Sequence, residues 1–118
     1  MLKVSTRKKS DRSSRRAARL RLGAAVFLRF MRDVAKWTTT VESRLAKVYI
    51  AIREDSIHVY AIARMERYDF ELSRLLSEFV IVQADLGIQA NGHIVPDGPE
   101  EELGAFFDPN EAFLITVV

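Results

Sequence analysis

The chain has 118 residues, of which 48% are hydrophobic, and it contains no cysteine, which excludes disulfides, thiolate-bound metals and cysteine nucleophiles. Residues 1–36 carry twelve Lys/Arg and two Asp (12 − 2 = +10), whereas residues 37–118 carry six Lys/Arg and fourteen Asp/Glu (6 − 14 = −8), which sums to the +2 of the whole chain. This asymmetry predicts a basic arm joined to a small acidic domain. A domain of that size is marginally stable alone, which favours a homo-oligomer or docking of the N-terminal segment onto the domain.

The N-terminal part is too short in apolar residues to span a membrane and is not expected to direct export, although the Arg/Ser-rich, acid-poor composition of residues 3–21 also permits a transit-type targeting segment. Its longest apolar run, Leu22–Leu28, has seven residues, against the about 20 that a spanning helix needs. Arg29 and Arg32 interrupt the hydrophobic region, and no small-residue cleavage site follows. Together with the missing cysteines, this indicates a cytoplasmic protein.

Residues 1–12 are polar and charged without apolar periodicity, which predicts a disordered basic tail. Residues 13–37 predict a basic amphipathic helix with Ser13 or Ser14 as its N-cap. Its apolar face on a helical wheel comprises Leu20, Ala24, Phe27, Leu28, Met31, Val34 and Ala35, and its basic face Arg21, Arg29, Arg32 and Lys36. The β-branched residues Thr38–Thr40 predict a loop or extended chain at the start of an α+β domain over residues 38–118.

A β-hairpin is predicted by two alternating segments, 46–53 and 56–63, which the two residues Glu54 and Asp55 separate. Pairing Arg53 with Ser56 places Ile52 opposite Ile57, Ile50 opposite Val59 and Tyr49 opposite Tyr60. In this register the apolar residues of both strands share one face of the sheet.

A second helix is predicted over residues 69–86 by apolar residues at spacings of three and four, with Gly87 as its C-terminal cap. The apolar positions are Leu72, Leu75, Leu76, Phe79, Val82 and Leu86. The β-branched run Val80–Val82 also permits a strand that begins near Phe79.

Residues 88–95 predict a third strand, with Asn91-Gly92 as a bulge or tight turn inside it. Pro99 and three glutamates then start a short helix, whose buried side comprises Leu103, Phe106 and Phe107. Residues 113–118 are almost wholly apolar, which is typical of an interior strand.

The predicted order is helix-β-β-α-β-α-β. We therefore expect an α+β fold in which helices pack on a mixed four-stranded sheet in two layers, with a basic N-terminal helical extension. The strand–helix–strand segments imply some parallel pairing.

Asp69 and Glu71 form an Asp-x-Glu pattern at the start of the second helix. Such a pair binds metal in some phosphoryl-transfer enzymes, but no glycine lies between Ala24 and Leu86 to form the phosphate-binding turn that these enzymes need. The favoured interpretation is that Asp69 caps the helix and Glu71 faces its dipole.

The two histidines, His58 and His93, lie on different predicted strands without a metal-ligand spacing. His58 is expected opposite Ala51, and His93 beside a turn. No cofactor fingerprint is present, because the five glycines are scattered. We therefore predict no catalytic, metal or cofactor site.

The second face of the predicted hairpin carries Lys47, Tyr49, Arg53, His58, Tyr60 and Arg64. A strand face that mixes aromatic and cationic side chains can bind single-stranded nucleic acid, so Tyr49, His58 and Tyr60 are candidate contacts. The favoured alternative is that a helix covers this face and that the tyrosines belong to the core.

The basic arm is the stronger candidate for contacts with phosphates, through Arg12, Arg15, Arg16, Arg19, Arg21, Arg29, Arg32 and Lys36. It could instead be a solubilising tail, fold onto the acidic domain, or be absent from a protein that starts at Met31. The leading hypothesis is a non-catalytic binding or assembly module whose residues 1–36 bind nucleic acid. The first alternative is a regulatory or immunity-type module that binds another protein through its acidic α+β domain, and the second is a metal-dependent phosphoryl-transfer enzyme.

Overall fold

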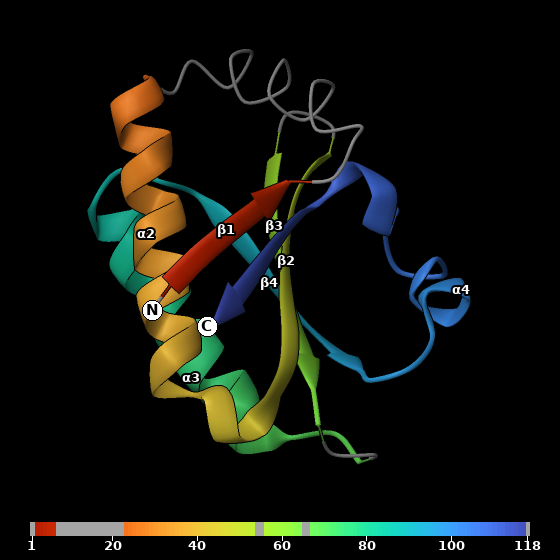
Figure 1. Cartoon of the computed structure of the whole chain (residues 1–118). Helices are drawn as coiled ribbons and strands as arrows, with labels where there is room; N and C mark the ends of the chain where they lie inside the picture. The colour runs from red at the N-terminus through yellow and green to blue at the C-terminus, as the bar shows by residue number, and fades with distance from the viewer. Residues whose placement is uncertain (1, 7–22, 54–55, 65–66, 118) are drawn as a thin grey trace.

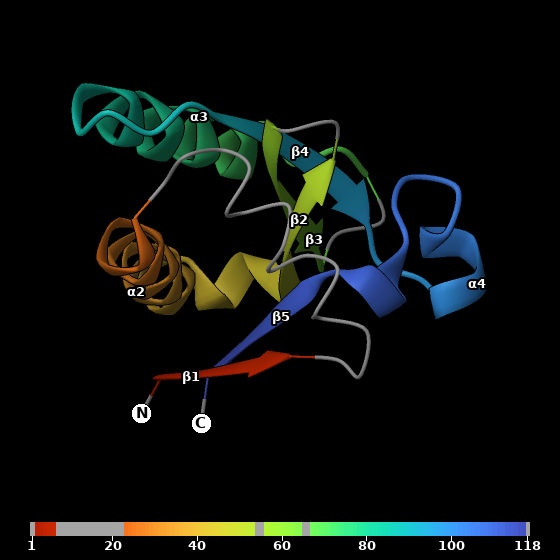
Figure 2. The ribbon, with the colours of Figure 1, turned by 90° about the horizontal axis from the view of Figure 1, so that it is seen from above.

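A computed structural model describes residues 2–6, 23–53, 56–64 and 67–117. It is an α+β fold in which a mixed sheet has the strand order β1-β5-β2-β3-β4. Helices α2 and α3 cover one face of the sheet, and the short helix α4 lies on the other side (Figures 1 and 2). The elements are β1 (Leu2–Thr6), α2 (Ala24–Thr40), β2 (Leu45–Arg53), β3 (Ser56–Ala63), α3 (Phe70–Asp85), β4 (Ala90–Pro96), α4 (Glu100–Leu103) and β5 (Phe113–Val117), with 3-10 turns at Glu42–Arg44 and Pro109–Glu111.

The hairpin register predicted from the sequence is confirmed. In the antiparallel pair β2–β3, Arg53 lies opposite Ser56, Ile50 opposite Val59, and Tyr49 opposite Tyr60. The register follows from the alternation of apolar residues, because a shift by one position would turn every apolar side chain to the other face.

The other predicted strands join this hairpin on both sides. β4 pairs with β3 in parallel, as expected for two strands joined by a helix. β5 pairs antiparallel with β2, so it is the interior strand that its apolar sequence predicts.

The disorder expected for residues 1–12 does not hold for Leu2–Thr6, which form β1 and pair antiparallel with the outer edge of β5. The segment LKVST contains β-branched residues and finds unpaired hydrogen-bonding groups on β5. The prediction for residues 7–12 lies outside the described residues.

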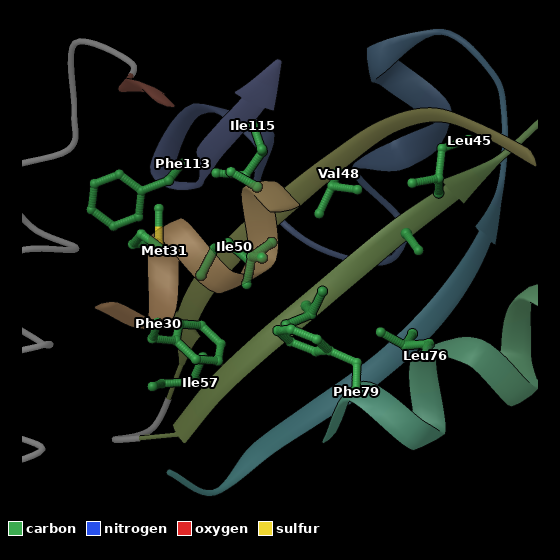
Figure 3. Packing of buried hydrophobic residues seen from close by; sticks show 14 of the residues in the cluster. Phe30, Met31, Leu45, Val48, Ile50, Ile57, Leu76, Phe79, Phe113 and Ile115 are labelled. Atoms are coloured by element: carbon green, nitrogen blue, oxygen red, sulfur yellow. The ribbon is translucent and has the colours of Figure 1, made fainter. Parts of the chain in front are cut away.

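The main core lies between the sheet and helices α2 and α3 (Figure 3). Its fully buried side chains include Phe30 and Val34 from α2, Ile50 from β2 and Leu72 from α3. Figure 3 shows Phe30 and Met31 reaching from α2 toward the sheet, and Phe79 from α3.

Helix α2 packs in the main core and crosses the boundary that was predicted between a basic extension and residues 38–118. The helix spans Ala24–Thr40, and Phe30 on its inner side is 0% exposed. Leu28, which was expected on the apolar face, is 54% exposed. The predicted N-cap at Ser13 or Ser14 lies outside the described residues. A chain that started at Met31 would lack Phe30 and the first two turns of this helix.

Thr38–Thr40 form the last turn of α2, where a loop or extended chain was expected. Thr38 Oγ1 donates to the Val34 carbonyl at 2.8 Å, and Thr40 Oγ1 donates to the Trp37 carbonyl at 2.7 Å. Because these hydroxyl groups donate to carbonyls of the preceding turn, the β-branched threonines continue the helix and do not end it.

Helix α3 has the boundaries that its sequence predicts. Asp69 is the N-cap and accepts a hydrogen bond from the Leu72 amide at 3.0 Å, while Gly87 ends the helix with φ of +90°. The outer end of the expected apolar face is partly solvent-exposed, because Val82 and Leu86 are 53% and 49% exposed.

Asn91-Gly92 is neither a bulge nor a turn, since the β3–β4 register runs without a break from Ala90 to Pro96. Gly92 is required for another reason. A Cβ atom at this position would lie 2.8 Å from Leu76 Cγ, so the glycine lets α3 approach β4 closely.

A smaller apolar cluster covers the opposite face of the sheet, so the domain has more than two layers. It is formed by Tyr49, Ala51, Tyr60, Ile62, Val95, Leu103, Phe107 and Ala112. The short helix α4 was predicted correctly, but Phe106 is 47% exposed and does not join its buried side. In the described part of the chain, no helix is long and apolar enough to cross a membrane.

Candidate functional site

The candidate phosphate-binding residues fall into two groups. Arg12, Arg15, Arg16, Arg19 and Arg21 lie outside the described residues, whereas Arg29, Arg32 and Lys36 lie on α2. With α2 assigned to the domain, the charge boundary moves: residues 1–22 carry nine Lys/Arg and one Asp (+8), and residues 23–118 carry nine Lys/Arg and fifteen Asp/Glu (−6).

The three basic residues of α2 differ in their surroundings. Arg32 and Lys36 are exposed and stand four positions apart, so they share one side of the helix. Arg29 is partly buried, and its Nη2 donates to the Leu86 carbonyl at 3.4 Å, which ties the helix to the end of α3. Arg32 and Lys36 are therefore the α2 cations that an anionic ligand can reach.

A hydrogen bond between two polar side chains also joins α2 to α3. Gln83 is 1% exposed, and its Nε2 donates to Asp33 Oδ2 at 3.1 Å. The Gln83 Oε1 and Arg29 Nε atoms are both buried and have no hydrogen-bond partner within the described residues. Asp33, which lies between Arg32 and Lys36 in the sequence, is therefore hydrogen-bonded to α3.

The aromatic strand face is covered, as the favoured alternative predicted. Tyr49 is 0% and Tyr60 2% exposed, beneath Leu103 and Phe107. The Phe107 ring stacks on Tyr60 with centroids 4.3 Å apart and contacts Tyr49 at 4.9 Å. Neither tyrosine presents a free ring face to a nucleic-acid base in this conformation.

His58 and His93 come together at the margin of this covered face. His58 lies opposite Ala51, as predicted, but His93 lies in the middle of β4 opposite Tyr60, and not beside a turn. The His58 Nδ1 and His93 Nε2 atoms are 2.8 Å apart, and the His93 ring stacks on Tyr60 at 4.7 Å. The sequence spacing of 35 residues contains no signal for this pairing, which depends on the parallel register of β3 and β4.

Arg53 completes this cluster from β2. Its Nη1 donates to Tyr60 Oη at 2.8 Å and to the Phe106 carbonyl at 3.1 Å, so it ties the sheet to the covering segment. Burial and, to a smaller extent, the Arg53 cation lower the pKa of His93. A cavity of about 370 Å³ adjoins Arg53 and is also lined by Asp108 and Glu111.

The capping interpretation of Asp69 is confirmed. Asp69 is 3% exposed and pairs with Arg44 at 3.0 Å in addition to capping α3. The Leu72 amide, with the Arg44 guanidinium, holds the pKa of Asp69 below its usual range. Glu71 pairs with Arg74 and is likewise held ionised, since that hydrogen bond lowers its pKa.

Both carboxylates of the Asp-x-Glu pattern are thus neutralised by arginines. Among the residues that the structure describes, no group of three or more His, Asp or Glu could hold a metal ion.

Exposed aromatic side chains form a third feature, at the start of α3. Phe70 is 78% and Tyr68 54% exposed, and their rings meet edge to face with centroids 4.9 Å apart. Tyr68 Oη donates to Ser73 Oγ at 2.9 Å, which fixes the pair against the helix. Large exposed aromatic rings of this kind are typical of binding surfaces.

The chain matches no protein-family model, no curated protein and no solved structure.

Proposed function

We propose that this protein is a small non-catalytic binding module that associates with nucleic-acid phosphates through its basic N-terminal segment and the exposed cations of α2. The observation that carries the proposal is the position of Arg32 and Lys36, which are exposed on the helix that continues the +8 segment of residues 1–22. A ligand bound to that segment would therefore meet further positive charge on the domain.

The charge distribution also supports a local contact over a diffuse one. Residues 23–118 carry a net charge of −6 and repel phosphate on average. Binding should consequently be confined to residues 1–22 and to Arg32 and Lys36 on α2. Each phosphate contact releases counterions, so the affinity should fall steeply with salt concentration.

The test compares full-length variants by fluorescence anisotropy with a labelled DNA duplex at several salt concentrations. Arg32→Glu should weaken binding and reduce the slope of log K against log salt by about one. Replacing Arg15, Arg16 and Arg19 by alanine should lower the slope further. Arg67→Glu is the matched control, because it changes the net charge equally at an exposed site outside α2.

Equal affinities and slopes for Arg32→Glu and Arg67→Glu would contradict a contact by α2. If the triple alanine variant also binds like the unaltered protein, or if no binding is measured at low salt, the nucleic-acid proposal fails. Deletion of residues 1–36 is unsuitable as a test, since it removes the buried Phe30 together with the charges.

The exposed pair Tyr68–Phe70 favours a second candidate function, the binding of a protein partner by a regulatory or immunity-type module. Phe70 is the most exposed large hydrophobic side chain of the described residues. Capture of one stoichiometric, nuclease-resistant partner should be lost with Phe70→Ser and kept with Leu28→Ser, a control with 54% exposure on α2. Retention by both variants would contradict this use of Phe70.

A further inference from the structure

The two imidazole rings of His58 and His93 lie edge to edge. Their centroids are 5.1 Å apart, and the Nδ1···Nε2 distance is 2.8 Å, so the centroid separation exceeds the N···N distance by about the two ring radii. The rings are inclined by 18°. The two nitrogens therefore point at each other along one line, which is the geometry of an N–H···N hydrogen bond.

This geometry limits the number of protons that the pair can hold. With both rings neutral, one nitrogen donates and the other accepts, and after one protonation a donor and an acceptor still face each other. After a second protonation both facing nitrogens carry a proton and the bond cannot form. The contact thus tolerates one positive charge and breaks with two.

The surroundings add to the cost of a second charge. Arg53 from β2 is the nearby cation, and its Nη1 is hydrogen-bonded to Tyr60, on which His93 stacks. Asp108 and Glu111 border the cavity next to Arg53. On β4 itself the neighbour is the neutral Asn91, whose Nδ2 donates to the Ile57 carbonyl.

We propose that the hydrogen bond between His58 and His93 is an acid-sensitive contact that holds β4 against β3. β4 is the last strand of the sheet and pairs with β3 alone among the described strands. It leads directly into the segment whose Leu103 and Phe107 cover Tyr49 and Tyr60. Loss of this hydrogen bond therefore loosens β4 and the segment with Leu103 and Phe107 that covers Tyr49 and Tyr60.

The direction of the pH dependence follows from proton counting. The pKa of His93 is lowered in the folded protein by burial and by Arg53, relative to the usual value near 6.5. Below about pH 6.5 the unfolded chain binds more protons than the folded one, so stability falls as the pH falls. For one such proton the unfolding equilibrium constant rises by up to about tenfold per pH unit. The window of pH 5.0–6.5 lies above the usual carboxylate pKa values.

The first experiment is an NMR titration of the full-length protein, in which the only two histidines give two sets of ring signals. We expect coupled titration, with the second protonation shifted below pH 6.5. The amide signals of Ala90–Pro96 and Leu103–Phe107 should change with it, while those of α2 around Val34 stay constant. Two independent titrations near pH 6.5, without changes in β4, would overturn the proposal.

The second experiment compares urea midpoints at pH 7.5 and 5.5. The unaltered protein should lose stability between these values, whereas His93→Gln should lose much less, because the remaining His58 then has no second imidazole to repel it. His58→Gln, the variant on the other strand, removes the second imidazole but keeps the burial and the Arg53 cation that lower the pKa of His93, so its loss should lie between those of the unaltered protein and His93→Gln. An equal fall of the urea midpoint between pH 7.5 and 5.5 in all three proteins would refute the proposed role of the His58–His93 contact. If neither variant folds, the NMR titration of the unaltered protein decides.

Discussion

Replacement of Phe30 by alanine tests whether α2 is part of the domain. Phe30 is 0% exposed, and its ring contacts Phe79 of α3 at 6.2 Å between centroids. Removal of a fully buried phenylalanine side chain costs about 3–5 kcal/mol through lost burial and the cavity left behind. The better helix propensity of alanine returns only about 0.5 kcal/mol of this. Since domains are stable by about 5–15 kcal/mol, the loss is a large share of the total.

Leu28→Ala is the matched control, two positions away on the same helix. Leu28 is 54% exposed, so its replacement should change the free energy of unfolding by about 0.5 kcal/mol or less. The assay is equilibrium unfolding in urea, followed by the fluorescence of Trp37. This residue is the only tryptophan and packs on Phe79 at 5.6 Å, so it reports the contact between α2 and α3.

With a slope of about 1–2 kcal/mol per molar urea, Phe30→Ala should lower the midpoint by about 1–4.5 M. Leu28→Ala should leave it almost unchanged. If the two variants unfold at the same urea concentration, α2 is not packed in the core. In that case the basic segment is an appended arm, as the charge distribution alone suggests.

Three further predictions concern α3 and the strand beneath it. Gly92→Ala should cost about 1–3 kcal/mol because its Cβ meets Leu76, and in the double variant with Leu76→Ala the two losses should sum to more than the measured total; additive losses in urea unfolding would contradict the contact. Asp69→Asn keeps the cap but removes the charge, so it should cost about 1 kcal/mol at pH 7. Because the pKa of Asp69 is lowered, the unaltered protein should lose this advantage progressively as the pH falls below about 4, and parallel pH profiles of the two proteins would exclude the pairing. Phe70→Ser should leave thermal stability within about 0.5 kcal/mol, since the side chain is 78% exposed, and a large fall in melting temperature would show that the ring is packed.

The sequence predicts the elements whose determinants are local. The β2–β3 register follows from a two-residue connection and strict alternation, and the ends of α3 follow from Asp69 and Gly87. In both cases the residues that specify the geometry lie within a few positions of one another, so no knowledge of the tertiary structure is needed.

Features set by packing between distant elements could not be predicted. A helix with apolar residues on several sides can bury more than one face, and whether Phe30 or Leu28 faces the sheet depends on the neighbouring α3. A parallel pair of strands has no turn to set its register, so the contact of His58 with His93 is not encoded locally. The neighbour that requires a glycine at position 92 is Leu76 on α3. Since this helix is distant in the sequence, the Asn91-Gly92 pair alone indicates only a bulge or a turn.

The place of β2 in the sheet has a consequence for the order of folding. One edge of β2 pairs with β3 through a two-residue connection, but the other edge pairs Val48 with Ile115, which is 67 positions later (115 − 48). During synthesis the hairpin can form early, while the second edge stays open until residues 113–117 have left the ribosome. For that interval the nascent chain presents an unpaired edge on a strongly apolar strand, which favours pairing with other chains.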